Sequence, residues 1–546
     1  MKKRSLVLEN FIPSSVWPIL IGLFAFLFIP GPLVLNPTNI AWLEHGDPAQ
    51  HFLGWQMFRN SPWTFPLGAN PNYGLDLSNS IVYSDSNPLF AIIFKFFSPL
   101  LPDVFQYFGL WLLICYTLQA YFAWKLIALF STSKYISAFG SILFVFAPPL
   151  MLRTPGHLSL SGHFLILAAL YLCFRSHQKN RITLWACLVG VTALVHAYFI
   201  PMVGILWLSD LCWQRYKKAI DNKTTFIEIA VVFASLAITT WQAGYFTVSG
   251  GVSAGGYGFY RMNIISLFNS CNSWSYILTG FNTEPGEFEG FNYLGLGGVI
   301  LFILSIPALL NRSISISDTI KKRSFLFLAL LFLAVFAISN NIGIGNYSFS
   351  YPLPSFIEKI ANIFRASGRL FWPVFYSILL ASIFLLSKSN KVHTAIVILG
   401  LASIVQVLDT NKVRMEIRQV LMVQPATTWT TKLKDPFWAE ASRKYKKLKI
   451  LLPMNTNPNW QTFAAYSAMN GLGTDSVYLA RIDDKNLEKT RYKSFEMLKN
   501  GGYENDTLYI VDPEHVELAY RSIRAGDSII QADGFTIVAP SWKEKI

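Results

Sequence analysis

The sequence predicts a polytopic α-helical membrane protein with about eleven transmembrane helices, followed by a soluble α/β domain. Three observations support this fold class. Of the 546 residues, 53% are hydrophobic and only 14% are charged, whereas about a quarter of the residues of an average soluble protein are charged. Apolar runs long enough to cross roughly 30 Å of hydrocarbon recur throughout residues 1–410. After residue 410, strand-like apolar runs alternate with helical patterns.

The predicted membrane domain covers residues 1–410. Its first apolar run follows a basic MKKR start and is not followed by a small-residue cleavage site, so we expect an uncleaved first span. Short basic loops alternate with the apolar runs, and the positive-inside rule therefore places the amino terminus in the cytoplasm and the carboxyl terminus outside. The run at 88–102 contains Lys95 and prolines, which indicates a re-entrant or interfacial helix. The predicted spans cover residues 16–35, 104–130, 136–152, 162–175, 183–198, 199–213, 225–246, 295–310, 324–339, 370–388 and 392–409.

The predicted soluble domain covers residues 411–546. Its strand-like runs are LKILL at 448–452, SVYLA at 476–480, TLYIV at 507–511 and FTIVA at 535–539. The formal charge of +14 lies largely in short loops of the membrane domain, so nucleic acid is not predicted as a partner. The five cysteines have neither metal-binding nor disulfide spacing.

Ionisable side chains crowd the start of the long first outer segment, residues 36–87, where WLEHGDPAQHF contains Glu44, Asp47 and His51. An aspartate followed by proline, with Gln50 three positions later, is typical of a helix start at which Asp47 caps and Gln50 closes a capping box. A capping carboxylate keeps one oxygen free. Catalysis and capping therefore both remain open for Asp47.

The same segment continues as NPNYGLDLSNSIVYSDSNPL, which is rich in asparagine, serine and aromatic residues. Such side chains suit a polyhydroxylated ligand such as a sugar, and they suit an ordinary turn-rich loop equally well. Asp85 lies just before the 88–102 run, where it could face Asp47 or cap the following helix.

Basic and aromatic side chains flank two predicted spans on the outer side. Arg153, His157 and His163 in LRTPGHLSLSGHF could bind a phosphate or could anchor the chain at the interface. His196 and Tyr198 in LVHAYFIP lie at the outer end of a span, where an ionisable side chain usually faces a protein interior or a wet cavity. A neutral, hydrogen-bonded core histidine is the alternative at that position.

The outer segment 247–293 begins with the glycine-rich stretch SGGVSAGGYGFYRMN, a candidate flap, and ends with a cluster of acids that includes Glu287 and Glu289. Further along, IFRASGRLFWP places Arg365 and Arg369 four positions apart, on one face if a helix forms there. Arginines outside the membrane are disfavoured by the positive-inside rule, so an anionic partner such as a lipid phosphate would explain them. Salt bridges to the neighbouring acids are the alternative.

The order of these features resembles the GT-C class of integral membrane glycosyltransferases: a first span, a long outer segment with an acid before an amphipathic helix, many spans and a soluble outer domain. Within that class, GDPAQHFLGWQMFR, SIVYSDSNPL, EGFNYLGLG and FRASGRLFWP are similar to an incompletely characterised bacterial family. That family is similar to O-antigen-modifying and serotype-converting sugar transferases. The resemblance covers nearly all of residues 1–410.

The resemblance implies roles for the outer side chains. The first outer loop of GT-C enzymes supplies a carboxylate as general base, which matches Asp47, with Asp85 in reserve because Gly46 stands where an adjacent second acid is usual. The resemblance also implies that basic side chains near the membrane boundary hold the phosphate of a polyprenyl-phosphate sugar. The candidates for that phosphate are Arg365, Arg369, Arg153 and His157. The candidates for other substrate contacts are Glu44, His51, His163, His196, Tyr198, Glu287 and Glu289.

The sequence thus predicts a glycosyltransferase at the outer face of a bacterial inner membrane, with a periplasmic carboxyl-terminal domain. Its predicted partners are a polyprenyl-phosphate sugar donor, a glycan acceptor (surface polysaccharide or lipid-linked oligosaccharide) and membrane lipid. We expect no required cofactor, and a divalent metal bound by Glu287 and Glu289 is the alternative to phosphate-binding arginines. A polysaccharide polymerase or ligase, a lipid-linked glycan transporter and a non-catalytic scaffold are the rival functions.

Overall fold

The computed structural model describes residues 13–175, 179–248, 255–310 and 321–543. The MKKR start, parts of two predicted basic loops and the beginning of the candidate glycine-rich flap lie outside these ranges. The described chain forms two compact units. The helical unit contains the described residues of Met1–Asn36, Phe108–Leu236 and Ser253–Val423, and the mixed unit contains those of Pro37–Tyr107, Ala237–Val252 and Gln424–Ile546. This division differs from the predicted boundary at residue 410, because the first outer segment belongs to the unit that contains the carboxyl-terminal sheet.

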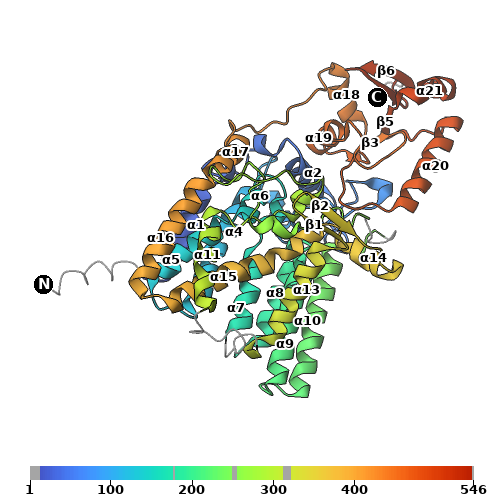
Figure 1. Cartoon of the computed structure of the whole chain (residues 1–546). Coiled ribbons are helices and arrows are strands. Elements are labelled where there is room, and N and C mark those ends of the chain that lie inside the picture. Colours follow the sequence, from blue (N-terminus) through green and yellow to red (C-terminus); the bar gives the residue numbers. More distant parts are fainter. Residues whose placement is uncertain (1–12, 176–178, 249–254, 311–320, 544–546) are drawn as a thin grey trace. The chain divides into compact units, whose positions relative to one another are not determined.

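Every predicted span overlaps at least one helix (Figure 1). Within the helical unit, α4 packs against α1, α5 and α7, and α11 packs against α15 and α16. The α-helices are α1 (Trp17–Phe28), α4 (Phe108–Ala128), α5 (Lys134–Val145), α6 (Pro148–Arg153), α7 (Phe164–Phe174), α8 (Arg181–Val195), α9 (Phe199–Tyr216), α10 (Asn222–Ala243), α11 (Leu296–Leu310), α13 (Ser324–Ile338), α14 (Ser355–Ala361), α15 (Trp372–Ser389), α16 (Val392–Asp409) and α17 (Asn411–Leu421). Short 3₁₀ helices and one hairpin connect them, namely η1 (Pro32–Leu35), η5 (Leu158–Ser161), η6 (Ile264–Leu267), η7 (Glu287–Gly290), η8 (Asn362–Phe364), η9 (Ser367–Phe371), β1 (Asn341–Ile344) and β2 (Tyr347–Ser350).

Four helical segments among the described residues are long and apolar enough to cross a membrane: Phe108–Ala128, Asn222–Ala243, Ser367–Ser389 and Val392–Asp409. The span Asn222–Ala243, which is α10, is only 17% buried within its most apolar window and exposes large apolar side chains such as Phe226, Phe233 and Ile238. A helix that exposes so many large apolar side chains is stable in hydrocarbon rather than in water. The helical prediction is therefore confirmed, while eleven crossings and their orientation stay predictions.

The carboxyl-terminal part of the mixed unit contains a five-stranded sheet with the order β4-β3-β5-β7-β6. Strands β3, β4 and β5 are parallel, and β7 is antiparallel to both β5 and β6. The strands are β3 (Lys447–Ile450), β4 (Gly473–Thr474), β5 (Thr507–Val511), β6 (Ser528–Ala532) and β7 (Phe535–Ala539). The helices of the mixed unit are η2 (Ala41–Leu43), α2 (Asp47–Asn60), η3 (Leu75–Leu77), α3 (Pro88–Phe96), η4 (Ser98–Leu100), α18 (Pro436–Lys444), α19 (Trp460–Asn470), α20 (Asp484–Asn500), η10 (Pro513–His515) and α21 (Val516–Ser522).

Three of the four predicted strands are confirmed, since β3, β5 and β7 overlap the runs at 448–452, 507–511 and 535–539. The prediction for SVYLA at 476–480 is wrong. The backbone N–H of Tyr478 donates to the hydroxyl of Tyr73 at 3.3 Å, and the N–H of Ala480 donates to the carbonyl of Tyr83 at 2.7 Å. These contacts with the first outer segment satisfy groups that a strand would have paired within the sheet. Strand β6, which precedes the β7 hairpin turn, was not predicted.

The first outer segment joins the sheet through its backbone. Asn72 and Gly74 exchange two hydrogen bonds with Thr474 of β4, with N···O distances of 2.8 Å each, and the ring of Phe52 stacks on Trp429 at 5.8 Å between centroids. Residues 37–107 are thus an integral part of the mixed unit rather than a free loop.

Candidate functional site

Four of the predicted side chains converge in the helical unit, and we refer to Arg153, His157, Glu289 and Arg369 as the Glu289 cluster. Arg153 is the last residue of α6, Glu289 lies in η7 and Arg369 lies in η9. Arg153 Nη1 lies 2.8 Å from Glu289 Oε2, and Arg369 binds the carboxylate through both Nε (2.7 Å to Oε2) and Nη2. His157 Nε2 lies 4.0 Å from Glu289 Oε1. Two guanidinium groups therefore share one carboxylate.

The Glu289 cluster is buried apart from the half-exposed imidazole of His157, since Arg153, Glu289 and Arg369 are at most 6% exposed. Burial by itself raises the pKa of the Glu289 carboxyl, but the charges of Arg153 and Arg369 outweigh burial and hold this pKa well below its ordinary value. The carboxylate is therefore ionised at neutral pH. Two positive groups and one negative group leave these three buried residues with a net charge of about +1.

Two glycines allow the backbones of η7 and η9 to approach closely enough for the Glu289–Arg369 pair to form. A Cβ atom on Gly368 would lie 2.4 Å from the Cα of Gly290, and a Cβ atom on Gly290 would lie 2.1 Å from the carbonyl oxygen of Arg261. Both distances are far below van der Waals contact. Close packing therefore requires glycine at position 368, directly before the charged Arg369.

Aromatic side chains frame the Glu289 cluster. The guanidinium carbon of Arg369 lies 4.6 Å from the ring centroid of Tyr198, and that of Arg153 lies 5.6 Å from the ring of Trp372. The imidazole of His163 packs on Trp372 at 4.1 Å between centroids, and its Nδ1 lies 2.8 Å from the hydroxyl of Tyr376. These contacts desolvate the arginines and fix their orientation.

His196 is part of the same aromatic frame. Its ring lies 5.7 Å from that of Tyr198, its Nδ1 accepts a hydrogen bond from the Tyr198 backbone N–H at 3.2 Å, and the Tyr198 hydroxyl accepts one from Ala366 N–H at 2.9 Å. Seven predicted residues thus gather in one region: Arg153, His157, His163, His196, Tyr198, Glu289 and Arg369.

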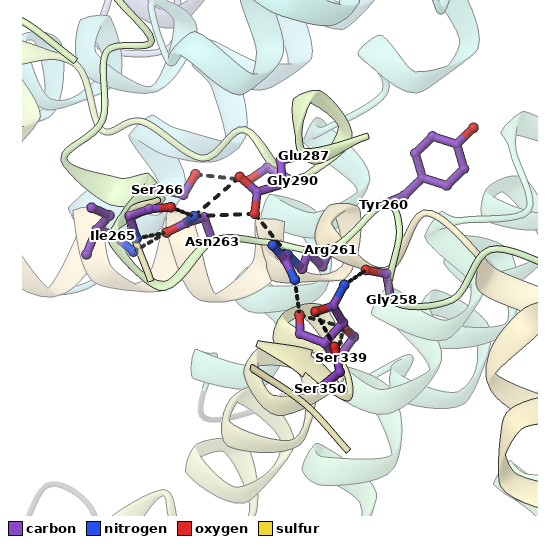
Figure 2. Close-up of polar contacts among 12 residues, drawn as sticks. Gly258, Tyr260, Arg261, Asn263, Ile265, Ser266, Glu287, Gly290, Ser339 and Ser350 are labelled. Carbon is purple, nitrogen blue, oxygen red and sulfur yellow. Dashed lines mark hydrogen bonds and ion pairs between the residues drawn. The ribbon is translucent and has the colours of Figure 1, made fainter. Parts of the chain in front are cut away.

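Glu287 belongs to a separate network (Figure 2). Its carboxylate accepts hydrogen bonds from Arg261 Nε at 2.9 Å and from Asn263 Nδ2 at 3.3 Å. Arg261 also donates to the carbonyl of Asn341 at 3.0 Å, which connects the outer segment to the β1–β2 hairpin. The neighbouring acids Glu287 and Glu289 therefore have different arginine partners, and the Glu287 network ties together the loops beside the Glu289 cluster.

No continuous helix forms over Arg365 and Arg369, so the condition under which they would share one face is not met. Arg365 lies between η8 and η9, and Ala366 breaks the helical geometry with φ −80° and ψ 65°. The guanidinium carbon of Arg365 lies 5.5 Å from the ring of Tyr260, whereas Arg369 binds Glu289. The salt bridge to the neighbouring acids, which the sequence left open, is the arrangement found for Arg369.

Asp47 and the other predicted residues of the first outer segment lie in the mixed unit. The structure does not place Asp47 at the cap position, which the sequence left open: α2 begins at Asp47 itself, and the N-cap is Gly46 with φ 62°. Gln50 closes no capping box, since its amide donates to the carbonyl of Tyr83 at 3.2 Å. The hydroxyl of Tyr478 donates to Asp47 Oδ1 at 3.4 Å. Asp47 is thus a partly exposed carboxylate at a helix N-terminus, contacted by a tyrosine hydroxyl.

The neighbours of Asp47 have structural contacts. The Glu44 carboxylate is buried and accepts the backbone N–H of Thr430 at 2.9 Å, and Gln461 donates to the Glu44 carbonyl. His51 is buried inside α2. Asp85 has a left-handed backbone with φ 52° and does not cap α3, because that cap is the side chain of Asn87, which accepts from Phe90 N–H at 3.4 Å.

Sequence reasoning missed Tyr478 and Gln461, the residues of the carboxyl-terminal segment that contact the Asp47 region. Tyr478 was hidden because the alternation in SVYLA was interpreted as a strand. In the part of the chain that the structure describes, no group of three His, Cys, Asp or Glu side chains is placed to hold a metal ion. The need for a cofactor stays an open prediction.

The fold and the site define a class: a mostly helical protein with four helices able to cross a membrane, a mixed unit with a five-stranded sheet, and a buried ion cluster beside one of the spans. The chain belongs to the family described as "Domain of unknown function (DUF6311)", whose model matches residues 19–411. Residues 437–540 match the DUF6311 C-terminal domain. No curated protein matches the chain.

One similar solved structure is the archaeal oligosaccharyltransferase AglB from Archaeoglobus fulgidus in complex with an inhibitory peptide and a dolichol-phosphate. The match covers 92% of this chain and 69% of that chain at 10% sequence identity, with a TM-score of 0.39. A likeness at this score carries no argument about activity.

Proposed function

We propose that this protein is a GT-C-type membrane glycosyltransferase that moves a sugar from a polyprenyl-phosphate donor to a glycan acceptor at the outer face of a bacterial inner membrane. The observation that carries the proposal is the pair of buried arginines, Arg153 and Arg369, which the Glu289 cluster holds at the start of the span Ser367–Ser389. Buried guanidinium groups at the end of a membrane helix suit an anionic ligand, and a lipid phosphate has the matching charge and depth.

In this proposal, Arg153 and Arg369 stabilise the charge that develops on the departing lipid phosphate, and His157 supplies the exposed edge of the anion site. Arginines fixed by Glu289, Tyr198 and Trp372 need no reorganisation as that charge develops, which is the physical basis of electrostatic catalysis. The phosphate leaves as an anion, so no acid is required to protonate it.

Asp47 is proposed as the general base that removes the proton of the acceptor hydroxyl. Its support is geometric: the carboxylate is partly exposed at the first residue of α2, and the Tyr478 hydroxyl donates to one of its oxygens. The mixed unit surrounding it is proposed to be periplasmic and to hold the acceptor. General-base catalysis contributes typically 10²–10⁴-fold to the rate.

The test is single-turnover transfer by the purified protein in nanodiscs, with a panel of polyprenyl-phosphate sugars and a lipid-linked oligosaccharide acceptor. Asp47→Asn should lower the rate by about 10²–10⁴-fold. Asp76→Asn is the matched control, because Asp76 lies in the same outer segment with an exposed carboxylate bound to Lys449, and it should retain full activity. Arg369→Lys keeps the positive charge but loses the two contacts that the guanidinium makes with the Glu289 carboxylate. Of the three variants, it should weaken donor binding most.

Full activity of Asp47→Asn, with Asp85→Asn tested in parallel, would refute Asp47 as the base. Wild-type protein that transfers single sugars from no donor but joins whole lipid-linked oligosaccharides would replace the proposal with a polymerase or ligase.

A further inference from the structure

Six large apolar side chains of the mixed unit are exposed on two short segments, one after α2 and one that comprises α3 and η4. Three of them are extreme: Phe65 is 78% exposed, Phe96 is 73% exposed and Leu100 is 83% exposed. We refer to the whole set as the aromatic patch, which consists of Trp63, Phe65, Ile93, Phe96, Phe97 and Leu100. An exposed apolar cluster of this size marks an interaction surface.

Two cations hold the two segments side by side. Lys95 on α3 donates to the carbonyl of Pro62 at 3.3 Å, and its ammonium lies 4.7 Å from the ring of Trp63. Arg59 in the last turn of α2 donates to Ser98 Oγ at 3.1 Å and to the Pro102 carbonyl at 2.9 Å. Both cations are buried, and their contacts hold the chain around Trp63 against α3 and η4.

The same part of the mixed unit contains the end of a candidate membrane span. The backbone N–H of Gly68 donates to the carbonyl of Gln242 in α10 at 2.7 Å, and a Cβ atom on Gly68 would lie 2.1 Å from the carbonyl oxygen of Ala243. Trp241 and Phe246, at this end of α10, are also exposed. The segment that follows Phe65 thus packs directly on the terminus of α10.

We propose that the aromatic patch inserts into the headgroup region of the lipid bilayer and anchors the mixed unit to the membrane surface. The occupant is lipid because the segment that follows Phe65 packs on the end of α10, whose exposed apolar side chains are stable in hydrocarbon. Residues 88–102 carry one charged side chain, Lys95, and no carboxylate, so anionic headgroups meet no repulsion there. Trp63 and the phenylalanines are the residue types that membrane interfaces and their apolar boundary accept.

The anchor has a consequence for α2. Asp47 is the first residue of this helix and Arg59 lies in its last turn, so the two residues are separated by about 18 Å along the axis at 1.5 Å per residue. The aromatic patch therefore fixes the end of the helix opposite to Asp47. Docking of the patch does not depend on catalysis and can be tested without a substrate.

The test uses nitroxide labels on single cysteines in a protein whose five native cysteines have been replaced, reconstituted in nanodiscs of phosphatidylethanolamine and phosphatidylglycerol. Collision rates with oxygen, which concentrates in lipid, and with a water-soluble nickel complex report the depth of each label. Labels at Phe96→Cys and Leu100→Cys should collide more with oxygen than with nickel. A label at Phe233→Cys, within the predicted span α10, provides the deep reference.

Tyr492→Cys and Tyr520→Cys are matched controls, because these side chains are 69% and 55% exposed on α20 and α21 of the same unit. Their labels should collide mainly with the nickel complex. Labels at 96 and 100 that behave like these controls would overturn the proposal in favour of a water-exposed surface. Labels shielded from both reagents would overturn it in favour of a protein partner. Phe65→Cys replaces either patch variant if that variant is not monodisperse.

Discussion

The ionised state of Glu289 can be tested by the substitution Glu289→Gln, which keeps the size of the side chain and removes its charge. In the wild type, Arg153 and Arg369 are both buried and share this single carboxylate. Glu289→Gln removes the carboxylate that both buried guanidinium groups share. Breaking a buried ion pair in this way costs about 3–5 kcal/mol of unfolding free energy.

Thermal unfolding in nanodiscs, followed by tryptophan fluorescence, measures the effect. Because the unfolding entropy of a 546-residue chain is large, a loss of 3–5 kcal/mol should lower the Tm by about 3–4 °C. Glu284→Gln is the matched control, because Glu284 is exposed in the same segment, and its Tm should equal that of the wild type. The double variant Glu289→Gln/Arg369→Gln should lose less unfolding free energy than the two single variants lose together, by at least about 1 kcal/mol. The reason is that Arg369→Gln removes one of the two guanidinium charges that Glu289 binds.

Acidification provides an independent check of the same prediction. The arginines hold the pKa of the Glu289 carboxyl below its value in the unfolded chain, which is about 4.3. The stabilisation is therefore fully present above that value and is lost as the pH falls through the lower, folded-state pKa. The stability gap between wild type and Glu289→Gln should narrow below about pH 4. Equal melting of the two proteins at neutral pH would refute the buried ionised cluster.

Three further predictions concern other contacts. Gly368→Ala should lower the unfolding free energy by about 1–3 kcal/mol in the same melting assay, because its Cβ would overlap Gly290, and an unchanged Tm would show that the two backbones can separate freely. Burial raises the pKa of Asp475 to about 7, so ionisation of this side chain destabilises the fold as the pH rises from about 4 to 7. The unfolding free energy of Asp475→Asn should therefore exceed that of the wild type by up to about 4 kcal/mol at pH 8 and equal it at pH 4. A difference in unfolding free energy that does not change with pH would contradict this prediction. Tyr478→Phe removes the hydrogen bond to Asp47 and should lower single-turnover transfer about 2- to 10-fold with little change in Tm, whereas an unchanged rate would show that this hydroxyl does not assist the base.

The periodicity of the sequence predicted the helices well, because an apolar run of sufficient length in this composition has few alternatives to a helix. Each predicted span overlaps a helix, and β5 and β7 coincide with their predicted runs. The same local reasoning failed at SVYLA. Its alternation is produced by contacts with Tyr73 and Tyr83, more than 390 residues earlier, and not by a place in the sheet.

Helix boundaries were less predictable for a similar reason. The Asp-Pro pair made capping one of two open roles for Asp47, and the same pair does produce a cap at Asp435, whose side chain accepts the N–H of Phe437 at 2.9 Å. At α2, Gly46 takes the cap position with a positive φ, which a glycine adopts at no steric cost. Identical dipeptides therefore end in different geometries, and the residue before the pair decides between them.

The sequence alone determined which side chains could form a site, because charged residues next to apolar spans are costly and therefore few. It could not determine how they pair. Arg369 and Glu289 are 80 residues apart and Tyr478 is 431 residues from Asp47, so their contacts depend on packing between distant segments. The tertiary structure decided that Glu289 joins Arg153 to Arg369, that Glu287 binds Arg261 instead, and that the first outer segment folds with the carboxyl-terminal sheet. Hydrophobic periodicity predicts whether a residue is buried. Which side chain it contacts there depends on how the distant segments pack.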